Sequence, residues 1–279
     1  MASTGQMNES FLHEYNSRDA ILKYSTHTAG HGVNYLIQHE YASVYDSAID
    51  SCRRTSSAPL RVLEFGCGAG MNLIGVLSRL ERRGVPVARA YGTDFSASLI
   101  ESANGEARAF LPDRTLGKVS FHVARNERLS AELAEATESA VEGLLGSFDF
   151  VFGVNTFRYC HRLGKAQECA DDIYRLLRPG GVCVMIDMND RFPMFRSRLK
   201  RSVESDAEAY LPSLDEYAAP FERAGFELER KEHFCWVPHS AGRVLTAVCR
   251  ALTPVLNATV RTRAMRSLVV AQRPALRAS

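Results

Sequence analysis

Three glycines, Gly66, Gly68 and Gly70, alternate with other residues directly after a short apolar run that contains one acid, Glu64. Glycine lets a backbone turn sharply and approach a ligand without interference from a Cβ atom. A helix-like sequence follows, and the start of a helix directs free N–H groups and the positive end of its dipole at the same point. The stretch predicts a ligand-binding turn between a strand and a helix, with Cys67 inside it.

The spacing of the glycines separates two classes of ligand. A dinucleotide-binding GxGxxG pattern would place its last glycine at position 71, where this chain has Met71. The pattern present is E-x-G-x-G-x-G from Glu64 to Gly70, and it resembles motif I of the class I S-adenosylmethionine (SAM)-dependent methyltransferases. The resemblance implies that SAM is the cofactor, that Glu64 helps to position its methionine portion, and that the glycine turn leaves room for it.

Two further motifs follow in the order expected for that family. In AYGTDFS, Asp94 ends a predicted strand, where a carboxylate can accept both ribose hydroxyls, and Phe95 is placed to contact adenine. The alternative for Asp94 is a helix cap. In FDFVFGVNTF, Asn155 lies at a strand end under the methyl donor. Many family members carry an acid after the third strand, whereas this chain has HVARNERL, in which Asn126 can accept through its side-chain carbonyl.

The methyl acceptor must be inferred from residues outside these motifs. Phe157, Tyr159 and His161 follow the fourth strand, and His161 is a candidate general base because its ordinary pKa lies near neutrality. The alternative is a histidine at a helix end. After the fifth strand, Arg196 and Arg198 either form a solvated helix face or bind an anionic group.

These two segments are similar to a bacterial group that methylates isoprenoid carbon–carbon double bonds. That resemblance implies a prenyl diphosphate or a prenylated natural product as acceptor, with Tyr159 as the aromatic face for a developing carbocation. The alternatives are N- or O-methylation of a small-molecule natural product, or a SAM-binding fold without methyl transfer, such as a cyclase or an interaction module.

Composition and absent motifs narrow the partners. The net charge of +2 and the lack of an NPPY or DPPY sequence argue against nucleic acid, so a small-molecule acceptor is expected. No apolar run is long enough for a membrane span, and no signal peptide is recognisable. The seven cysteines are scattered without metal-ligand spacing, which favours a cytoplasmic protein with no metal. Assembly into a homo-oligomer is left open.

Alternating strand-like and helix-like segments indicate an α/β fold with a doubly wound, seven-stranded, mostly parallel sheet. Residues 1–58 are predicted to form a helical lid, in which Tyr24 contacts the cofactor and Tyr35 the acceptor. Residues 59–279 are the predicted core, with a helical insertion at about 238–263 and one long helix over 127–145. Strands are predicted at residues 61–65, 86–93, 119–123, 148–154, 182–187, 226–234 and 266–272.

Overall fold

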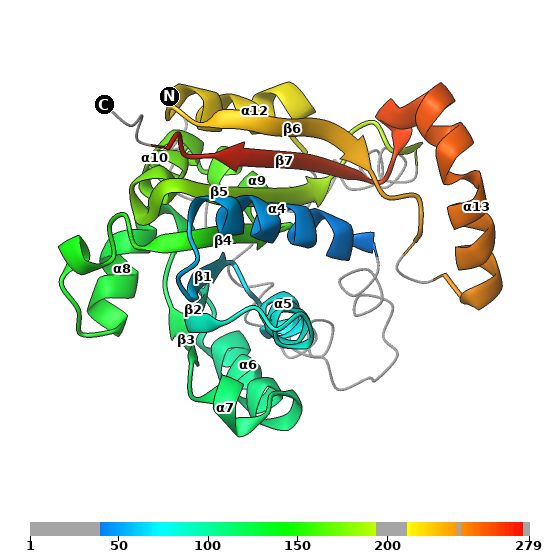
Figure 1. Ribbon diagram of the computed structural model, residues 1–279. Coiled ribbons are helices and arrows are strands. Elements are labelled where there is room, and N and C mark those ends of the chain that lie inside the picture. Colours follow the sequence, from blue (N-terminus) through cyan, green and yellow to red (C-terminus); the bar gives the residue numbers. More distant parts are fainter. Residues whose placement is uncertain (1–39, 194–210, 239–240, 276–279) are drawn as a thin grey trace.

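The computed structural model describes residues 40–193, 211–238 and 241–275. Within them, seven strands form one sheet in the order β3-β2-β1-β4-β5-β7-β6 (Figure 1). The strands are β1 (Leu60–Phe65), β2 (Val87–Asp94), β3 (Val119–Val123), β4 (Phe148–Val154), β5 (Leu177–Met188), β6 (Glu227–Phe234) and β7 (Arg266–Gln272). Neighbours from β3 to β5 are parallel, and β7 runs antiparallel between β5 and β6. The predicted fold class is confirmed.

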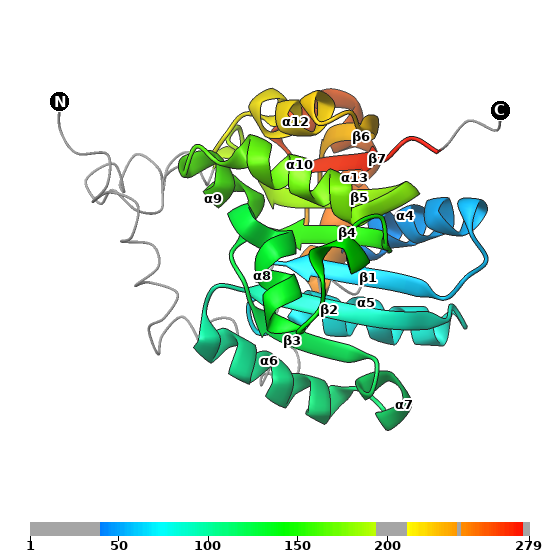
Figure 2. The ribbon, with the colours of Figure 1, turned by 90° about the vertical axis from the view of Figure 1, so that its left-hand side faces the viewer.

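Helices cover both faces of the sheet (Figure 2). One face carries α4 (Ala42–Thr55), α5 (Met71–Arg82) and α6 (Ala97–Phe110), and the other carries α8 (Leu129–Ala136), α9 (Phe157–Arg162), α10 (Ala166–Leu176) and α12 (Leu214–Arg223). The central strands are apolar throughout because alternate residues point into two cores. Phe150 and Phe152 stack in the first core with ring centres 5.0 Å apart, while Val151 belongs to the second.

Helix α4 is the part of the predicted lid that the structure describes, and it packs into the first core. Tyr45 and Ile49 of this helix are fully buried against the sheet. Arg83 of α5 pairs with Asp46 at 2.8 Å and with Asp50, so ion pairs also hold α4 to the next helix. The core therefore begins before residue 59. Tyr24 and Tyr35 lie outside the described residues, and a lid formed by the segment before residue 40 stays a prediction.

The prediction of one long helix over residues 127–145 is wrong. A short 3₁₀ turn (Asn126–Arg128) precedes α8, which ends at Ala136, and a second 3₁₀ turn (Val141–Gly143) follows. The Thr137 hydroxyl donates to the carbonyl of Leu133 at 2.7 Å, and Glu138 adopts a φ of +51°. A backbone in the left-handed region cannot continue an α-helix, so the segment breaks here despite its helix-favouring composition.

The fifth strand, β5, is longer than the predicted 182–187. The RPGG sequence, which was predicted to close the preceding helix, belongs to the first part of this strand. Gly180 has a φ of +79°, and a Cβ there would lie 3.0 Å from the Thr55 hydroxyl. Glycine therefore allows the start of β5 to pass closely under the end of α4.

The connection between the last two strands, β6 and β7, begins at the edge of the sheet where the parallel strands have their carboxyl ends. Met188 of β5 lies opposite Arg266 of β7, which lies opposite Phe234 of β6. The carboxyl end of β6 therefore shares an edge with those of β1, β4 and β5. The chain leaves this edge through α13 (Arg243–Val260) and a 3₁₀ turn (Arg261–Arg263) and then enters β7. A short helix, α7 (Asp113–Leu116), completes the described helices.

Candidate cofactor and acceptor site

The glycine turn lies between β1 and α5, and all three glycines have positive φ. The φ angles are +61° at Gly66, +54° at Gly68 and +79° at Gly70. A Cβ at Gly66 would lie 2.0 Å from the Thr156 hydroxyl, and one at Gly70 would lie 2.9 Å from the Phe121 ring. A Cβ at Gly68 would meet no atom of the described residues within 4 Å, apart from its two chain neighbours. Two of the glycines are thus required by packing, and Gly68 is the one that faces open space.

Asp94, at the end of β2, is held against this turn. Its Oδ2 accepts the Gly68 N–H at 2.9 Å, and its Oδ1 accepts the Ser96 N–H at 3.0 Å. The side chain is 5% exposed, and burial raises the pKa of the carboxyl. A carboxylate has about four lone-pair sites, so capacity for a ligand hydroxyl is left beside the backbone contacts from Gly68, Ser96 and Phe95. Phe95 follows Asp94 directly in sequence and is half-buried. The glycine turn is also joined to β2 through the backbone, because the Cys67 N–H donates to the Thr93 carbonyl at 2.8 Å.

Glu64 lies beneath the turn and is completely buried. Its Oε2 accepts the Leu73 N–H in the first turn of α5 at 2.9 Å. Its Oε1 is also buried and has no hydrogen-bond partner among the described residues. Burial raises the pKa of this carboxyl well above its usual range.

Thr156 connects the glycine turn to two other predicted site residues. The Asn126 side-chain N–H donates to the Thr156 hydroxyl at 2.7 Å. The amide oxygen of Asn126 is therefore the atom of this side chain that can accept a hydrogen bond from a ligand. The neighbouring Asn155 has a φ of +55°, and its N–H donates to Ile186 of β5 at 2.8 Å. The Asn155 Oδ1 is buried and has no hydrogen-bond partner within the described chain. The carboxyl edge of the sheet therefore brings together segments far apart in sequence.

These features fit SAM. Buried acceptors without partners cost free energy unless a ligand supplies donors. Glu64 Oε1, Asn72 Oδ1 and Asn155 Oδ1 are such acceptors in the described structure, and SAM carries an ammonium group, two ribose hydroxyls and a positive sulfonium. The open space over Gly68 gives the backbone access to this ligand.

The structure does not support a direct role for Phe157. Its ring is fully buried in the second core and lies 4.7 Å from the ring of Phe221. Substrate contact would require the core to repack. The prediction treated every aromatic residue after β4 as part of the site mouth, but the first turn of α9 directs Phe157 inward.

His161 is likewise packed toward α12. Its ring lies edge-on to Phe157 at 5.1 Å and stacks on Tyr217 at 5.9 Å. Its Nε2 is buried, and burial lowers the pKa of the imidazole. The half-buried ring lies between α9 and α12, and a general base at this position stays a prediction.

Tyr159 follows β4 at the carboxyl edge of the sheet and is in contact with Arg158. The Arg158 guanidinium lies 4.8 Å from the Tyr159 ring centre and donates to its hydroxyl at 2.8 Å. Arg158 also forms an ion pair with the buried Asp187 at the end of β5, at 3.8 Å. The sequence places Arg158 near the site mouth with Tyr159 but assigns it no role. Arg196 and Arg198 lie outside the described residues.

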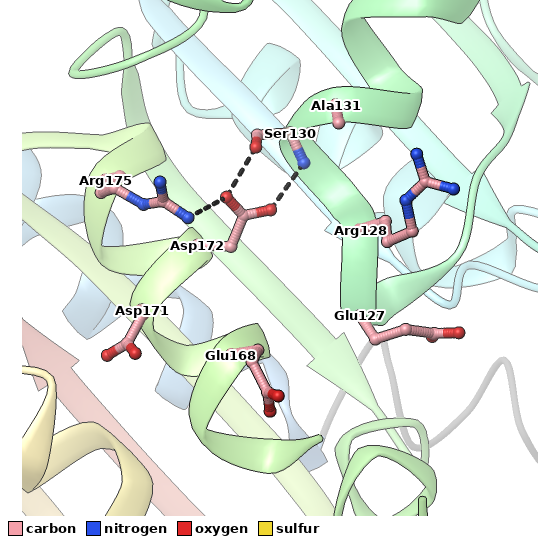
Figure 3. A pocket seen from close by; sticks show the side chains of 8 residues that line it. All are labelled: Glu127, Arg128, Ser130, Ala131, Glu168, Asp171, Asp172 and Arg175. Carbon is pink, nitrogen blue, oxygen red and sulfur yellow. Dashed lines mark hydrogen bonds and ion pairs between the residues drawn. The ribbon is translucent and has the colours of Figure 1, made fainter.

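A surface pocket of about 250 Å³ lies between α8 and α10, and Figure 3 shows its lining. Asp172 accepts hydrogen bonds from the Ser130 N–H at 2.7 Å and from the Ser130 hydroxyl at 2.6 Å, so it caps α8. None of the predicted cofactor or acceptor residues lines this pocket. Its carboxylates are explained by helix capping and surface charge.

The sequence from residue 56 to 234 matches the model of the methyltransferase domain family. A non-reducing polyketide synthase of Penicillium shearii is 26% identical over 146 residues, which are 52% of this chain and 6% of that protein. The 3-methylorcinaldehyde synthase of Talaromyces stipitatus is 30% identical over 133 residues, which are 48% of this chain and 4% of that protein. The chain thus spans a small fraction of the length of these relatives.

Solved structures show the same fold at low sequence identity. The magnesium protoporphyrin IX methyltransferase of Synechocystis PCC 6803, solved with S-adenosylhomocysteine (SAH) bound, has a TM-score of 0.58, is 13% identical, and the match covers 95% of this chain and 99% of that one. The CurJ carbon methyltransferase has a TM-score of 0.55 and is 16% identical, with 92% of this chain and 58% of that one covered.

The chain belongs to the methyltransferase domain family. It is a class I SAM-dependent methyltransferase, and SAM is its cofactor. When bound, SAM supplies a methyl group activated by attachment to a sulfonium. The residues of this chain must bind and orient that cation and place an acceptor in line with the methyl group.

Binding of SAM is expected to release a proton from Glu64. The raised pKa keeps the free carboxyl protonated to higher pH, and a bound cation favours the carboxylate and lowers that pKa. Affinity should therefore rise with pH until the free protein is itself ionised at this position. Calorimetry in two buffers with different ionisation enthalpies measures the proton count. Glu64→Gln should bind SAM more weakly and without this release; unchanged release in that variant would assign the proton to another group.

Proposed function

We propose that this methyltransferase methylates a carbon atom of a small isoprenoid acceptor, at a double bond. The observation that carries the proposal is the packing of the half-buried His161 ring against Phe157 and Tyr217, at ring distances of 5.1 and 5.9 Å. O-methylation of a hydroxyl calls for a base at the acceptor, and this packing argues against His161 in that role. An alkene needs no deprotonation before it accepts a methyl group.

Two further observations support a carbon acceptor. A carbon methyltransferase is among the proteins that share the fold, and polyketide synthases of secondary metabolism are among the relatives in sequence. The segments after β4 and β5 also carry the resemblance to enzymes that methylate isoprenoid double bonds.

The proposed acceptor chemistry gives the aromatic ring of Tyr159 a role in stabilising a carbocation. An alkene that attacks the methyl group with its π electrons forms the new carbon–carbon bond and breaks the bond to the sulfonium sulfur, so that SAH is left. The resulting carbocation then passes a proton to a diphosphate oxygen of the acceptor and becomes the product. An aromatic ring stabilises such a cation by about 1–2 kcal/mol when water is excluded. The Arg158 guanidinium, 4.8 Å from the ring centre and paired with Asp187, fixes the ring at the strand edge.

The test is product analysis after incubation of the full chain with methyl-labelled SAM. The acceptor panel contains prenyl diphosphates, the corresponding prenyl alcohols, phenols and amines. We expect a single added methyl group on carbon in a prenyl diphosphate, located by mass spectrometry and NMR. Methylation of oxygen or nitrogen alone would reject the acceptor class while leaving the methyltransferase assignment intact.

Variants at Tyr159 separate the ring from the hydroxyl. Tyr159→Phe keeps the ring and should retain most of the turnover. Tyr159→Leu removes the ring and should lower kcat by roughly 5- to 30-fold, the equivalent of about 1–2 kcal/mol, with SAM affinity unchanged. Equal turnover in the two variants would remove the role of the aromatic face.

A further inference from the structure

Helix α13 stands beside the sheet, apart from the helices that cover its two faces (Figure 1). Thr246 is the one buried residue among its 18. Side-chain hydrogen bonds link the helix to the rest of the protein: the Arg250 guanidinium donates to Glu40 at 2.8 and 3.0 Å, and the Trp236 ring N–H donates to Asn257 at 2.7 Å. A helix of this length with so little burial leaves most of its surface for another contact.

The exposed surface of α13 is apolar. Of the eight large hydrophobic side chains exposed in the described residues, five lie on this helix: Val244, Leu245, Val248, Leu252 and Val255. Val244 is 80% exposed and Val255 is 59% exposed. At 3.6 residues per turn, the five side chains fall within an arc of about 100°, which makes them one continuous stripe. A stripe of this kind on a protein surface marks an interaction site.

The charge of this segment is of one sign. Residues 243–263 contain four arginines and no acidic residue: Arg243, Arg250, Arg261 and Arg263. Arg250 is paired with Glu40 and Arg261 with Glu232. An amphipathic helix with a continuous apolar stripe and arginines on its polar face is typical of a segment that lies in the interface of an anionic bilayer.

A membrane explains this combination better than a second copy of the chain. The stripe contains only valine and leucine, whereas protein interfaces draw most of their affinity from aromatic anchors. In a bilayer the aliphatic side chains enter the acyl region and the arginines reach the phosphates.

We propose that α13 docks the protein on the surface of an anionic membrane. The helix connects β6 to β7 at the carboxyl edge of the sheet, which also carries the glycine turn. Docking there would hold the SAM site close to the bilayer. None of the helices in the described residues is both long and apolar enough to cross a membrane, so the contact is peripheral.

The single tryptophan of the chain makes the proposal measurable. Trp236 contacts α13 directly, so its emission should shift to the blue when the full protein binds vesicles of phosphatidylcholine with phosphatidylglycerol. Vesicles of phosphatidylcholine alone should give a weaker shift, and added salt should reduce binding. Co-sedimentation gives an independent measure of binding. Absence of binding to the anionic vesicles would overturn the proposal.

Matched variants locate the contact. Val248→Glu with Val255→Glu should weaken vesicle binding by at least about tenfold, because each change removes a buried aliphatic group and adds a repelled charge. Phe110→Glu with Leu145→Glu alters two exposed hydrophobic residues elsewhere and should leave binding unchanged. Equal loss in both pairs would contradict the assignment to α13. A dimer in ultracentrifugation that only the α13 pair dissociates, with no vesicle binding, would identify a second copy instead.

Discussion

Replacing Gly68 by valine is expected to weaken SAM binding by at least about 100-fold, the equivalent of about 2.7 kcal/mol, while the protein stays folded. No atom of the described residues beyond the adjoining two lies within 4 Å of the Cβ position, so the new side chain enters the space left for the ligand. The φ of +54° adds strain, since a β-branched residue rarely adopts this conformation. Isothermal calorimetry on the purified variant measures the affinity.

Gly84→Val is the matched control for backbone strain. Gly84 has a φ of +65° and also has nothing within 4 Å of its Cβ position, but it follows α5 and precedes β2, at the opposite edge of the sheet. This variant should lose about 1–3 kcal/mol of stability and bind SAM normally. Similar SAM affinities for the two variants would show that the cofactor does not approach Gly68.

Asp94→Ala is expected to weaken SAM binding by roughly 10- to 100-fold. The carboxylate contacts the turn through the Gly68 N–H at 2.9 Å, and we assign its remaining lone pairs to the ribose hydroxyls. Hydrogen bonds to a charged group contribute about 1.5–3 kcal/mol, which gives the expected range. The loss should appear in calorimetry for SAM and for SAH, because both carry the same ribose.

Ser96→Ala separates this role from helix capping. Ser96 is the N-cap of α6 and accepts the Leu99 N–H. Its alanine variant should lose about 1 kcal/mol of stability with SAM affinity retained. If Asp94→Ala behaved in the same way, with lower thermal stability and normal affinity, Asp94 would be a cap and not a ribose ligand.

The sequence alone determined those parts of the site whose signal is local. The glycine turn needs positive φ at adjacent positions, and only glycine adopts these conformations freely, so the pattern itself indicates the turn. Asp94 ends an apolar strand, and strand ends in a parallel sheet meet at one edge. The order of strands and helices then predicted the sheet, because buried parallel strands are apolar throughout.

The tertiary structure decided which side each residue faces. Phe157 and His161 follow the fourth strand as predicted, yet Phe157 packs against Tyr217 and Phe221 in the second core, and the half-buried His161 ring lies against Phe157 and Tyr217. Burial of an aromatic ring depends on which side chains the neighbouring helix places against it. That helix, α12, lies some fifty residues further along the chain.

The same distinction applies to the glycines and to α4. Gly66 is required by Thr156, whereas Gly68 faces open space, and no sequence pattern separates the two. Tyr45 is aromatic like the residues of the predicted lid, but it lies under Phe150 and Phe152 of the sheet. The hydrophobic effect is non-directional, so an apolar side chain can be buried against any apolar surface. The sequence specified that these side chains are apolar. Only long-range packing determined which surface they cover.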